Sequence, residues 1–302
     1  MNRIFSYRIA HSDLTHGQLT VGEYLRNRGY SHHILASLKR IPGAILANGI
    51  SVPVNILLHE GDVLTIHLSE CTSPSDILPV YMDLSVLYED QDLMIINKPA
   101  DMPVHPSIHN HENTLANAIA WRCQQQNLPF VYRCINRLDR DTSGLLILAN
   151  HALSASILSI CLKNRNIRRT YLAIVEGYLS HGGVINAPIA REEGSALRRC
   201  VDFQRGEEAV THYEPVFYNA EKNVTLIRLR LETGRTHQIR VHMQYLGHPL
   251  IGDFLYYPRR NLISRQALHS WQLDFSHPIT GEAMHFQAPL PDDMTFAIGR
   301  TI

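Results

Sequence analysis

The stretch NRLDRDTSGLLIL, residues 136 to 148, decides how the fold of this chain is interpreted. Its polar half places Asp139 between Arg137 and Arg140, and its apolar half, from Ser143 onward, has the composition of a buried strand. We therefore expect Asp139 on a loop at the mouth of a sheet, where the scaffold can aim its carboxylate. The two arginines would keep that carboxylate ionised and could also hold phosphates. An N-capping aspartate or a surface ion pair would give the same pattern, so this stretch alone leaves both interpretations open.

Four further segments, taken with this one, point to a family. They are NKPADMPVHPS (97–107), RRTYLAIVEG (168–177), LRLETGRTHQIRVHMQYLGHPLIGD (229–253) and LHSWQLDFSHP (268–278). Together with RLDRDTSG, and in this order, they closely resemble the RluA-type family of RNA pseudouridine synthases, from about residue 84 to residue 289. The resemblance implies that the chain isomerises uridine to pseudouridine in RNA. It also implies an α+β fold, in which helices flank a mixed, mostly antiparallel central sheet.

The implied reaction breaks the bond from ribose to the ring nitrogen, turns the uracil over and rejoins it through carbon 5. Because no electrons or phosphates are exchanged, we expect no metal and no other cofactor. By resemblance, Asp139 is the essential carboxylate, which attacks the sugar or abstracts a sugar proton; the sequence leaves both routes open. Tyr171 would lay its ring on the uracil, a contact worth about 1 to 3 kcal/mol, although a tyrosine packed in the core would also fit the strand pattern.

Arg240 matches the family arginine that pairs with the aspartate. We expect Thr236 to cap its helix and Gly247 to end it, which leaves Arg240 at the edge of the core. A bidentate bond to Asp139 would stabilise the charged carboxylate and fix its rotamer. Arg240 would therefore complete a catalytic trio with Asp139 and Tyr171.

Other residues are predicted to hold the RNA. The target uridine must leave its stack, at a cost of a few kcal/mol. By resemblance, Arg137 fills or braces the vacated space, and Arg235 and His237 contact the flanking phosphates, while Arg140 is a further phosphate ligand. A capping or packing role for His237 is equally open.

Two positions depart from the family pattern. Asn136 stands where the family commonly has histidine before Arg-Leu-Asp, and Asp101 stands where NKPAG would place glycine. Neither change removes a member of the trio, so the reaction is still implied, whereas a precise substrate is not.

The composition describes a folded protein, since 45% of the 302 residues are apolar and 19% are charged. No apolar run approaches the roughly eighteen residues of a membrane helix, and MNRIFSYRIAHSD lacks the features of an export signal. The cysteines are odd in number and form no C-x-x-C pair, which predicts a cytoplasmic protein without a disulfide framework. The five cysteines are Cys71, Cys123, Cys134, Cys161 and Cys200.

The charges balance, with 28 lysines and arginines against 28 aspartates and glutamates. Because phosphate contacts supply most non-specific affinity for RNA, the cations of an RNA-binding protein with no net charge must be concentrated locally. Basic clusters occur at 163–169, 198–199, 228–240 and 259–265. They predict a focused basic cleft on a neutral body, and hence binding that depends steeply on salt.

Residues 1–70 are predicted to form a small α/β domain. Thr20 and Glu23 make a capping box for a first helix, Ser31 caps a second, and Asn48–Gly49 signals a hairpin. This order of elements resembles the S-four-like RNA-binding domain. Residues 15–70 carry four cations against four anions, so a packing module without RNA contact is the alternative.

Residues 71–82 are polar and broken by prolines, which predicts a linker, and residues 83–302 would form the catalytic domain. Helices are expected at 114–126 and 151–164. Long alternating runs at 169–177, 207–218 and 222–232 predict strands, and few strand–helix–strand units occur, so a doubly wound parallel sheet is disfavoured. No exposed heptad pattern appears, and we expect a monomer.

Three other functions are compatible with parts of the sequence. The histidines of HPSIHNH (105–111) suggest a metal hydrolase, but no H-E-x-x-H or Cys/His quartet is present. A glycosidase would pair Asp139 with Asp141 or Asp253, although arginine-rich surroundings favour RNA over sugar. A binding or ribosome-assembly factor that has lost catalysis would fit the unusual asparagine and the neutral N-terminal residues. RNA is the expected partner in that case too, with ribosomal and transfer RNA both open.

Overall fold

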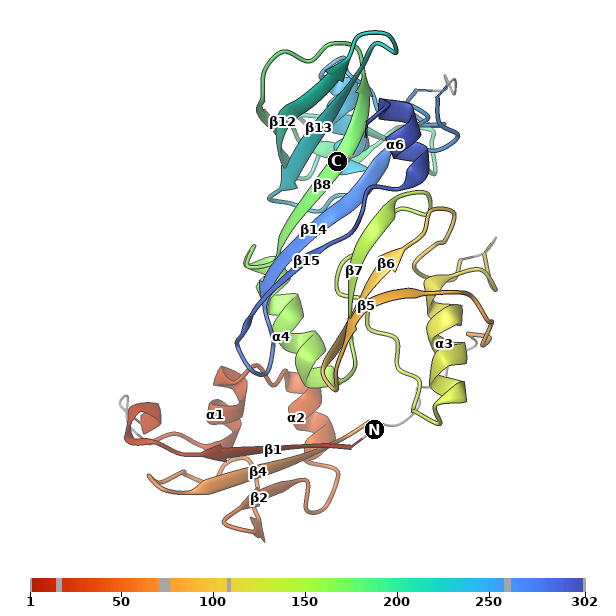
Figure 1. Ribbon diagram of the computed structural model, residues 1–302. Helices are drawn as coiled ribbons and strands as arrows, with labels where there is room; N and C mark the ends of the chain where they lie inside the picture. Colours follow the sequence, from red (N-terminus) through yellow and green to blue (C-terminus); the bar gives the residue numbers. More distant parts are fainter. Residues whose placement is uncertain (1, 15–17, 71–76, 108–109, 258–261, 301–302) are drawn as a thin grey trace.

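The computed structural model describes residues 2–14, 18–70, 77–107, 110–257 and 262–300. Its largest element is a nine-stranded sheet in the order β5-β6-β7-β14-β8-β13-β12-β9, with β15 also paired to β14 (Figure 1). β7 and β14 are parallel, and the other neighbouring strands are antiparallel. The predicted α+β class with a mixed, mostly antiparallel sheet is therefore confirmed. The strands are β5 (Ser85–Glu89), β6 (Leu93–Lys98), β7 (Ser143–Ala149), β8 (Arg168–Glu176), β9 (Gly183–Asn186), β12 (Val210–Asn219), β13 (Val224–Leu231), β14 (Leu268–Ser276) and β15 (Ala283–Gln287).

Helices cover both faces of this sheet, as the alternation of β7 requires. Leu146 and Leu148 point into a core shared with α3 (Leu115–Gln125) and α5 (Gln238–Tyr245). Leu145 and Ile147 point the opposite way, into a core shared with α4 (Ala152–Lys163). The helix α6 (Asp292–Ile298) packs on a further cluster with residues of β8 and β13. The expected helices at 114–126 and 151–164 correspond to α3 and α4.

Glycine is required at position 144, where the polar loop passes into strand β7, for a steric reason. Gly144 has φ of 109°, and a Cβ atom there would lie 2.2 Å from the carbonyl oxygen of Ser270. Glycine is needed because β14 approaches β7 at this point in the parallel pairing of Ser143 with His269 and Gly144 with Ser270. The loop containing Asp139 therefore ends where strands from distant parts of the chain meet.

Residues 2–69 build a separate four-stranded antiparallel sheet in the order β1-β4-β2-β3. The capping box of Thr20 and Glu23, the Ser31 cap and the Asn48–Gly49 turn are all present. β1 was not predicted, yet it pairs with β4 along its whole length. The elements are β1 (Asn2–Arg8), the 3-10 helix η1 (His11–Leu14), α1 (Val21–Asn27), α2 (His32–Leu38), β2 (Ile45–Ala47), β3 (Ile50–Ser51) and β4 (Val63–Ser69).

This N-terminal segment, residues 2–70, packs against the end of the large sheet beside α4 (Figure 1). Leu153 of α4 lies in its hydrophobic core. Glu70 accepts hydrogen bonds from Arg133 at 2.8 Å and from the backbone nitrogen of Ala152 at 2.6 Å. Of the predicted linker, residues 71–76 lie outside the described residues, and residues 77–82 run along α3, where Asn117 donates to the carbonyl oxygen of Leu78. The two sheets are thus joined by specific contacts on α4.

No helix in the described part of the chain is long and apolar enough to cross a membrane. The cysteines Cys123, Cys134, Cys161 and Cys200 are unpaired, and Cys71 lies outside the described residues.

Candidate active site

A cavity of about 570 Å³ contains most of the residues predicted to act on RNA. Its walls come from the loop before β7, the first residues of β8, the end of α4 and the start of α5. The sequence-predicted residues that line it are Asp139, Tyr171, Arg240, Arg137, Arg235 and His237. Segments that are up to about a hundred positions apart in the chain are thus brought to one site.

Arg240 is the organising cation of the cavity, but its main partner is not the one expected. Its Nε and Nη2 donate to the two carboxylate oxygens of Asp253 at 2.6 and 2.8 Å, whereas a single nitrogen, Nη1, donates to Asp139 at 2.9 Å. The predicted bidentate bond to Asp139 is therefore wrong. Asp253 is fully buried and also accepts the backbone nitrogens of Leu255 and Tyr256. It fixes the plane of the guanidinium so that one donor remains for Asp139.

The start of α5 also differs from the prediction. Thr236 does not cap the helix; the N-cap is His237, whose backbone is left-handed with φ of 58° and whose side chain makes no capping bond. The Oε1 atom of Gln238 instead accepts from the backbone nitrogen of Arg235 and from the hydroxyl of Thr233. A left-handed residue other than glycine costs roughly 1 to 3 kcal/mol and is tolerated where the surroundings fix it. Gly247 ends the helix, as predicted.

Asp139 is the accessible carboxylate of this group, with 29% of its side chain exposed against 3% for Arg240. The loop that holds it is fixed from behind by two cations. Lys98, which is fully buried, donates to the carbonyl oxygen of Arg140 at 2.9 Å, and Arg265 donates to the carbonyl oxygen of Asp141 at 3.1 Å. Burial lowers the pKa of Lys98 to about 7, although nearby Asp141 opposes that shift.

His237 lies beside Asp139 inside the cavity, with its Nε2 atom 3.8 Å from the carboxylate. Its Nδ1 atom is 3.0 Å from the Tyr256 hydroxyl. Burial lowers the pKa of His237, an effect that the Asp139 charge only partly offsets. The ring is therefore mainly neutral at neutral pH and can act as a hydrogen-bonding group near the Asp139 carboxylate, while its contact with the flanking phosphates stays a prediction.

Tyr171 is buried, with 4% of its surface exposed, and lies near the start of β8 on the sheet face that α3 and α5 cover. It is both a core residue and a wall of the cavity, so the two interpretations of this tyrosine are not exclusive. Packing on the core holds an aromatic ring in one orientation, which favours its use as a platform for a base.

The arginines that flank Asp139 in sequence have different environments. Arg137 is exposed and lines the cavity. Arg140 does not line it: its Nε and Nη2 donate to Asp141 at 3.0 and 3.1 Å, and its Nε lies 3.6 Å from Asp101. The cation against Asp139 is thus Arg240 and not Arg140, whose phosphate-binding role stays a prediction.

Both departures from the family pattern have a structural account. Asn136 is buried, and its side chain donates to the carbonyl oxygen of Leu145 and accepts the backbone nitrogen of Ile147. It therefore ties its segment to the edge of β7 like an additional strand residue. Asp101 has φ of 58°, a left-handed conformation in which glycine is unstrained and aspartate is tolerated.

The sequence did not single out several residues of the cavity. Lys163, Arg165 and Arg169 line it, and they belong to a basic cluster whose position in the fold was unknown. The Nε atom of Arg169 is buried without a hydrogen-bond partner. Their only sequence signal was the concentration of positive charge itself.

Neither carboxylate proposed for a glycosidase is available. Asp253 is fully buried against Arg240, and Asp141 is bound by both donors of Arg140. A second acid facing Asp139 across a sugar is therefore not found among them.

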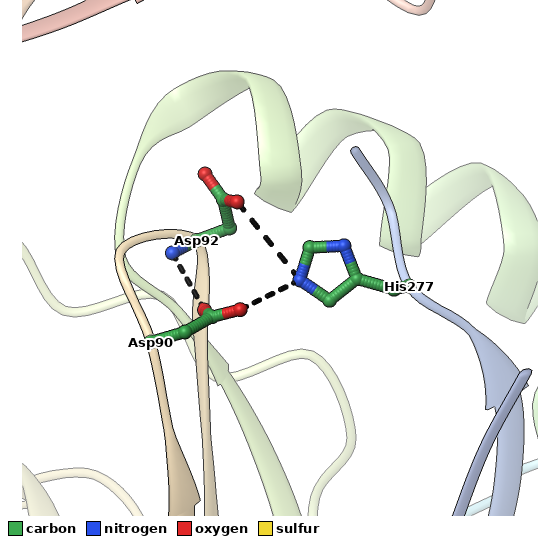
Figure 2. A group of neighbouring side chains, drawn as sticks. All are labelled: Asp90, Asp92 and His277. Carbon is green, nitrogen blue, oxygen red and sulfur yellow. Dashed lines mark hydrogen bonds and ion pairs between the residues drawn. The ribbon is translucent and has the colours of Figure 1, made fainter. Parts of the chain in front are cut away.

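Potential metal ligands gather elsewhere, where Asp90, Asp92 and His277 meet among the described residues (Figure 2). His277 donates from Nε2 to Asp90 at 2.8 Å, and its Nδ1 accepts backbone nitrogens of residues 279 and 280. Asp92 accepts from Arg3 at 2.6 Å and from His151 at 2.8 Å. Because these hydrogen bonds connect Arg3 and His151 to the group, it serves as a structural junction between the N-terminal segment and the large sheet.

Comparisons with known proteins show which proteins this chain resembles. A sequence model described as RNA pseudouridylate synthase matches residues 92–245. The chain is 42% identical to an uncharacterized RNA pseudouridine synthase of Bacillus subtilis (strain 168), YjbO, across 92% of this chain and 97% of that protein. It is also 42% identical to ribosomal large subunit pseudouridine synthase D of Vibrio vulnificus (strain CMCP6), across 70% of this chain and 68% of that protein. The solved structure of human RNA pseudouridylate synthase domain containing 1 matches with a TM-score of 0.58 and 26% identity, across 72% of this chain and 86% of that one.

Proposed function

This chain belongs to the RNA pseudouridylate synthase family and is an RNA pseudouridine synthase, and we propose that it modifies uridines of large-subunit ribosomal RNA with Asp139 as the reacting carboxylate. The main support for this role is the setting of Asp139. It is a partly exposed carboxylate, held by one nitrogen of a buried arginine, in a cavity that also contains Tyr171.

The proposed chemistry follows from that setting. One oxygen of Asp139 accepts the bond from Arg240, so the other is available to the ribose of the target nucleotide. In one route it attacks the anomeric carbon as the bond to the uracil nitrogen breaks, and carbon 5 of the uracil later displaces the carboxylate from the resulting ester. In the other it removes a sugar proton as the same bond breaks, and the glycal takes that proton back when carbon 5 adds to the anomeric carbon. In both routes the released uracil stays against Tyr171 and turns, carbon 5 loses its proton after the new bond forms, and the freed ring nitrogen gains one. Enclosure in the cavity protects the intermediate from hydrolysis.

Arg137 and Arg235 are proposed as ligands of the flanking RNA, and His237 as a neutral hydrogen-bonding neighbour of Asp139. The ribosomal substrate is proposed on the similarity to relatives named ribosomal large subunit pseudouridine synthase D. We also propose the division into an S-four-like domain (1–70), a linker (71–82) and a catalytic domain (83–302), acting as a monomer in the cytoplasm.

The test compares wild-type protein with Asp139→Asn on ribosomal and transfer RNA from cells that lack the gene. Wild type is expected to form pseudouridine at defined positions of the large-subunit RNA. The variant, which keeps the size of the side chain, should be slower by at least about 10³-fold, because it loses the anionic oxygen. Pseudouridine is mapped by chemical modification and sequencing, and binding is measured in parallel.

Other outcomes have distinct meanings. Modification of transfer RNA alone would replace the proposed substrate. If both proteins bind RNA and the wild type forms no pseudouridine, the protein acts as a binding factor and the assignment of Asp139 fails.

A further inference from the structure

A second hollow, of about 390 Å³, adjoins the active cavity and is lined by four arginines: Arg191, Arg199, Arg205 and Arg235. We call it the arginine pocket. Gly234 and Arg235 belong to the walls of both hollows, so the two are continuous. The proposed chemical steps do not involve this second hollow. Its four arginines give it a positive charge, which favours an anionic ligand.

The pocket is built on a two-stranded hairpin of β10 (Ile189–Arg191) and β11 (Arg199–Val201). Arg191 and Arg199 are directly opposite each other in its register, so both side chains leave the same face. Like charges in such a pair destabilise a hairpin by up to about 1 kcal/mol. The structure thus keeps an unfavourable pair that a bound anion would relieve.

Arg205 comes from the turn that follows β11. The Asp202 side chain accepts the backbone nitrogens of Gln204 and Arg205 and the Nε of Arg205, which orders the turn. Gly206 is required there, because a Cβ atom would lie 2.3 Å from the carbonyl oxygen of Asp202. The same turn presents Phe203, which is 69% exposed. An exposed aromatic side chain on the turn that carries Arg205 can offer its face to an unpaired base.

The charges of the pocket are only partly neutralised. Arg235 pairs with Glu207, and Arg205 pairs with Asp202. Within the described residues no carboxylate oxygen lies within 4.0 Å of the Arg191 nitrogens, and Arg199 donates to carbonyl oxygens of its own hairpin. Two positive charges are therefore left for a ligand.

We propose that the arginine pocket binds phosphodiester groups of the RNA strand that leaves the active cavity on one side of the target uridine, with Phe203 as a platform for an unpaired base. The strand would pass over Gly234, which has no side chain, with Arg235 as the wall common to both hollows. This proposal rests on the proposed function, since it assumes that the uridine occupies the active cavity. An RNA-binding protein with no net charge must concentrate its cations locally, and the arginine pocket is one such location.

The test uses binding of a fluorescein-labelled twelve-nucleotide oligouridylate to full-length Asp139→Asn protein, so that no turnover occurs. Adding Arg191→Gln and Arg199→Gln should raise Kd about tenfold at moderate salt. The slope of log K against log salt should become shallower by about 1.4, because each lost phosphate contact on a single strand contributes about 0.7. Phe203→Ala should raise Kd without changing that slope.

The matched control replaces Arg122 and Arg228, which are also partly exposed and each paired with one glutamate. Arg228 projects from the sheet face opposite the active cavity, beside Trp271. Equal changes in Kd and slope for the two double variants, or no change in either, would overturn the proposal. Thermal melting shows whether the variants are folded.

A second measurement separates this proposal from the proposed function. In an otherwise wild-type chain, Arg191→Gln with Arg199→Gln should raise the half-saturating concentration of large-subunit RNA about tenfold, with a much smaller change in the maximal single-turnover rate. If wild type forms no pseudouridine but the oligouridylate result stands, the proposed function fails and the arginine pocket remains an RNA site.

Discussion

Two clusters in this molecule pair carboxylates with cations: one is the junction between the N-terminal segment and the large sheet, and the other lies in the active cavity. The same kind of ion pair has a different consequence in each. At the junction, Asp92 is 5% exposed and accepts hydrogen bonds from Arg3 and His151. In the cavity, Asp139 keeps 29% of its side chain exposed and accepts one bond from Arg240. The two carboxylates differ in burial and in the number of cationic or histidine donors they accept, two for Asp92 and one for Asp139. A buried carboxylate with two such donors holds two parts of the chain together, whereas one at a cavity wall is accessible to a ligand.

Asp139 is kept in place through Arg240 by a second carboxylate, Asp253. Asp253 is buried and accepts two hydrogen bonds from the Arg240 guanidinium and two from backbone nitrogens. Arg240 therefore connects a buried ion pair with the accessible one at Asp139. Variants that break each part should separate stability from catalysis.

Asp253→Asn is expected to have the largest combined effect. The amide cannot accept both guanidinium donors, so Arg240 is left buried with a poor partner and its Nη1 no longer points steadily at Asp139. We expect the single-turnover rate to fall about 10²-fold and the free energy of unfolding to fall by about 3 kcal/mol. Arg240→Lys should show a similar double loss, because lysine lacks the planar fork. Denaturant melts and single-turnover assays measure the two losses; full activity in either variant would contradict the role given to the clamp.

Arg3→Met should affect stability alone. Losing one charged hydrogen bond to Asp92 is expected to lower the free energy of unfolding by about 2 kcal/mol, with the single-turnover rate within about twofold of wild type. Burial opposes ionisation of Asp92, but the bonds from His151 and Arg3 outweigh it and lower its pKa. This contribution is therefore present at neutral pH and lost as pH falls through the lowered pKa, so the two proteins should converge in acid. A difference that persists unchanged in acid would show that the ion pair is not its source.

Local signals account for what the sequence predicted of the fold. Thr20 and Ser31 bond to the backbone within three residues, so their helices could be placed from sequence alone. β1 was missed because Phe5 is its one buried residue, which leaves no alternating apolar pattern. Its partner β4 lies some sixty residues later, and nothing local signals that pairing. The β10–β11 hairpin was missed for the related reason that its strands are only three residues long.

The residues of the site also fall into those that a local sequence motif indicates and those that only the folded structure reveals. Asp139, Tyr171 and Arg240 lie within motifs, and the fold places them around one cavity. Asp253 and Lys98 act through tertiary contacts: Asp253 bonds an arginine thirteen positions away, and Lys98 bonds a carbonyl forty-two positions away. A sequence shows such residues but not the partners that give them their roles. The prediction that Arg140 would stabilise the Asp139 carboxylate was wrong for the same reason. Two residues that are neighbours in the chain need not have side chains that face each other, and Arg140 donates to Asp141 instead.

Lys98 offers the finest test of the comparison, because it is a buried cation held by carbonyl oxygens instead of a carboxylate. Burial lowers its pKa to about 7 from an ordinary value near 10.5. Between pH 7 and pH 10.5, Lys98 is mostly protonated in the unfolded chain and mostly neutral in the folded one. The contribution of Lys98 to the free energy of unfolding therefore rises with pH in this range. Between pH 7 and pH 8 the gain should be about 1 kcal/mol.

Lys98→Met should remove that gain, and the exposed Lys39→Met should keep it. The quantity to compare is the difference in unfolding free energy between wild type and each variant at pH 7 and pH 8, in which other titrating groups cancel. A Lys98→Met difference that is the same at both pH values would mean that the ammonium is protonated throughout. In that case two carbonyl oxygens would be enough to keep a buried ammonium charged without a carboxylate partner, unlike the cations of the junction, which pair with carboxylates.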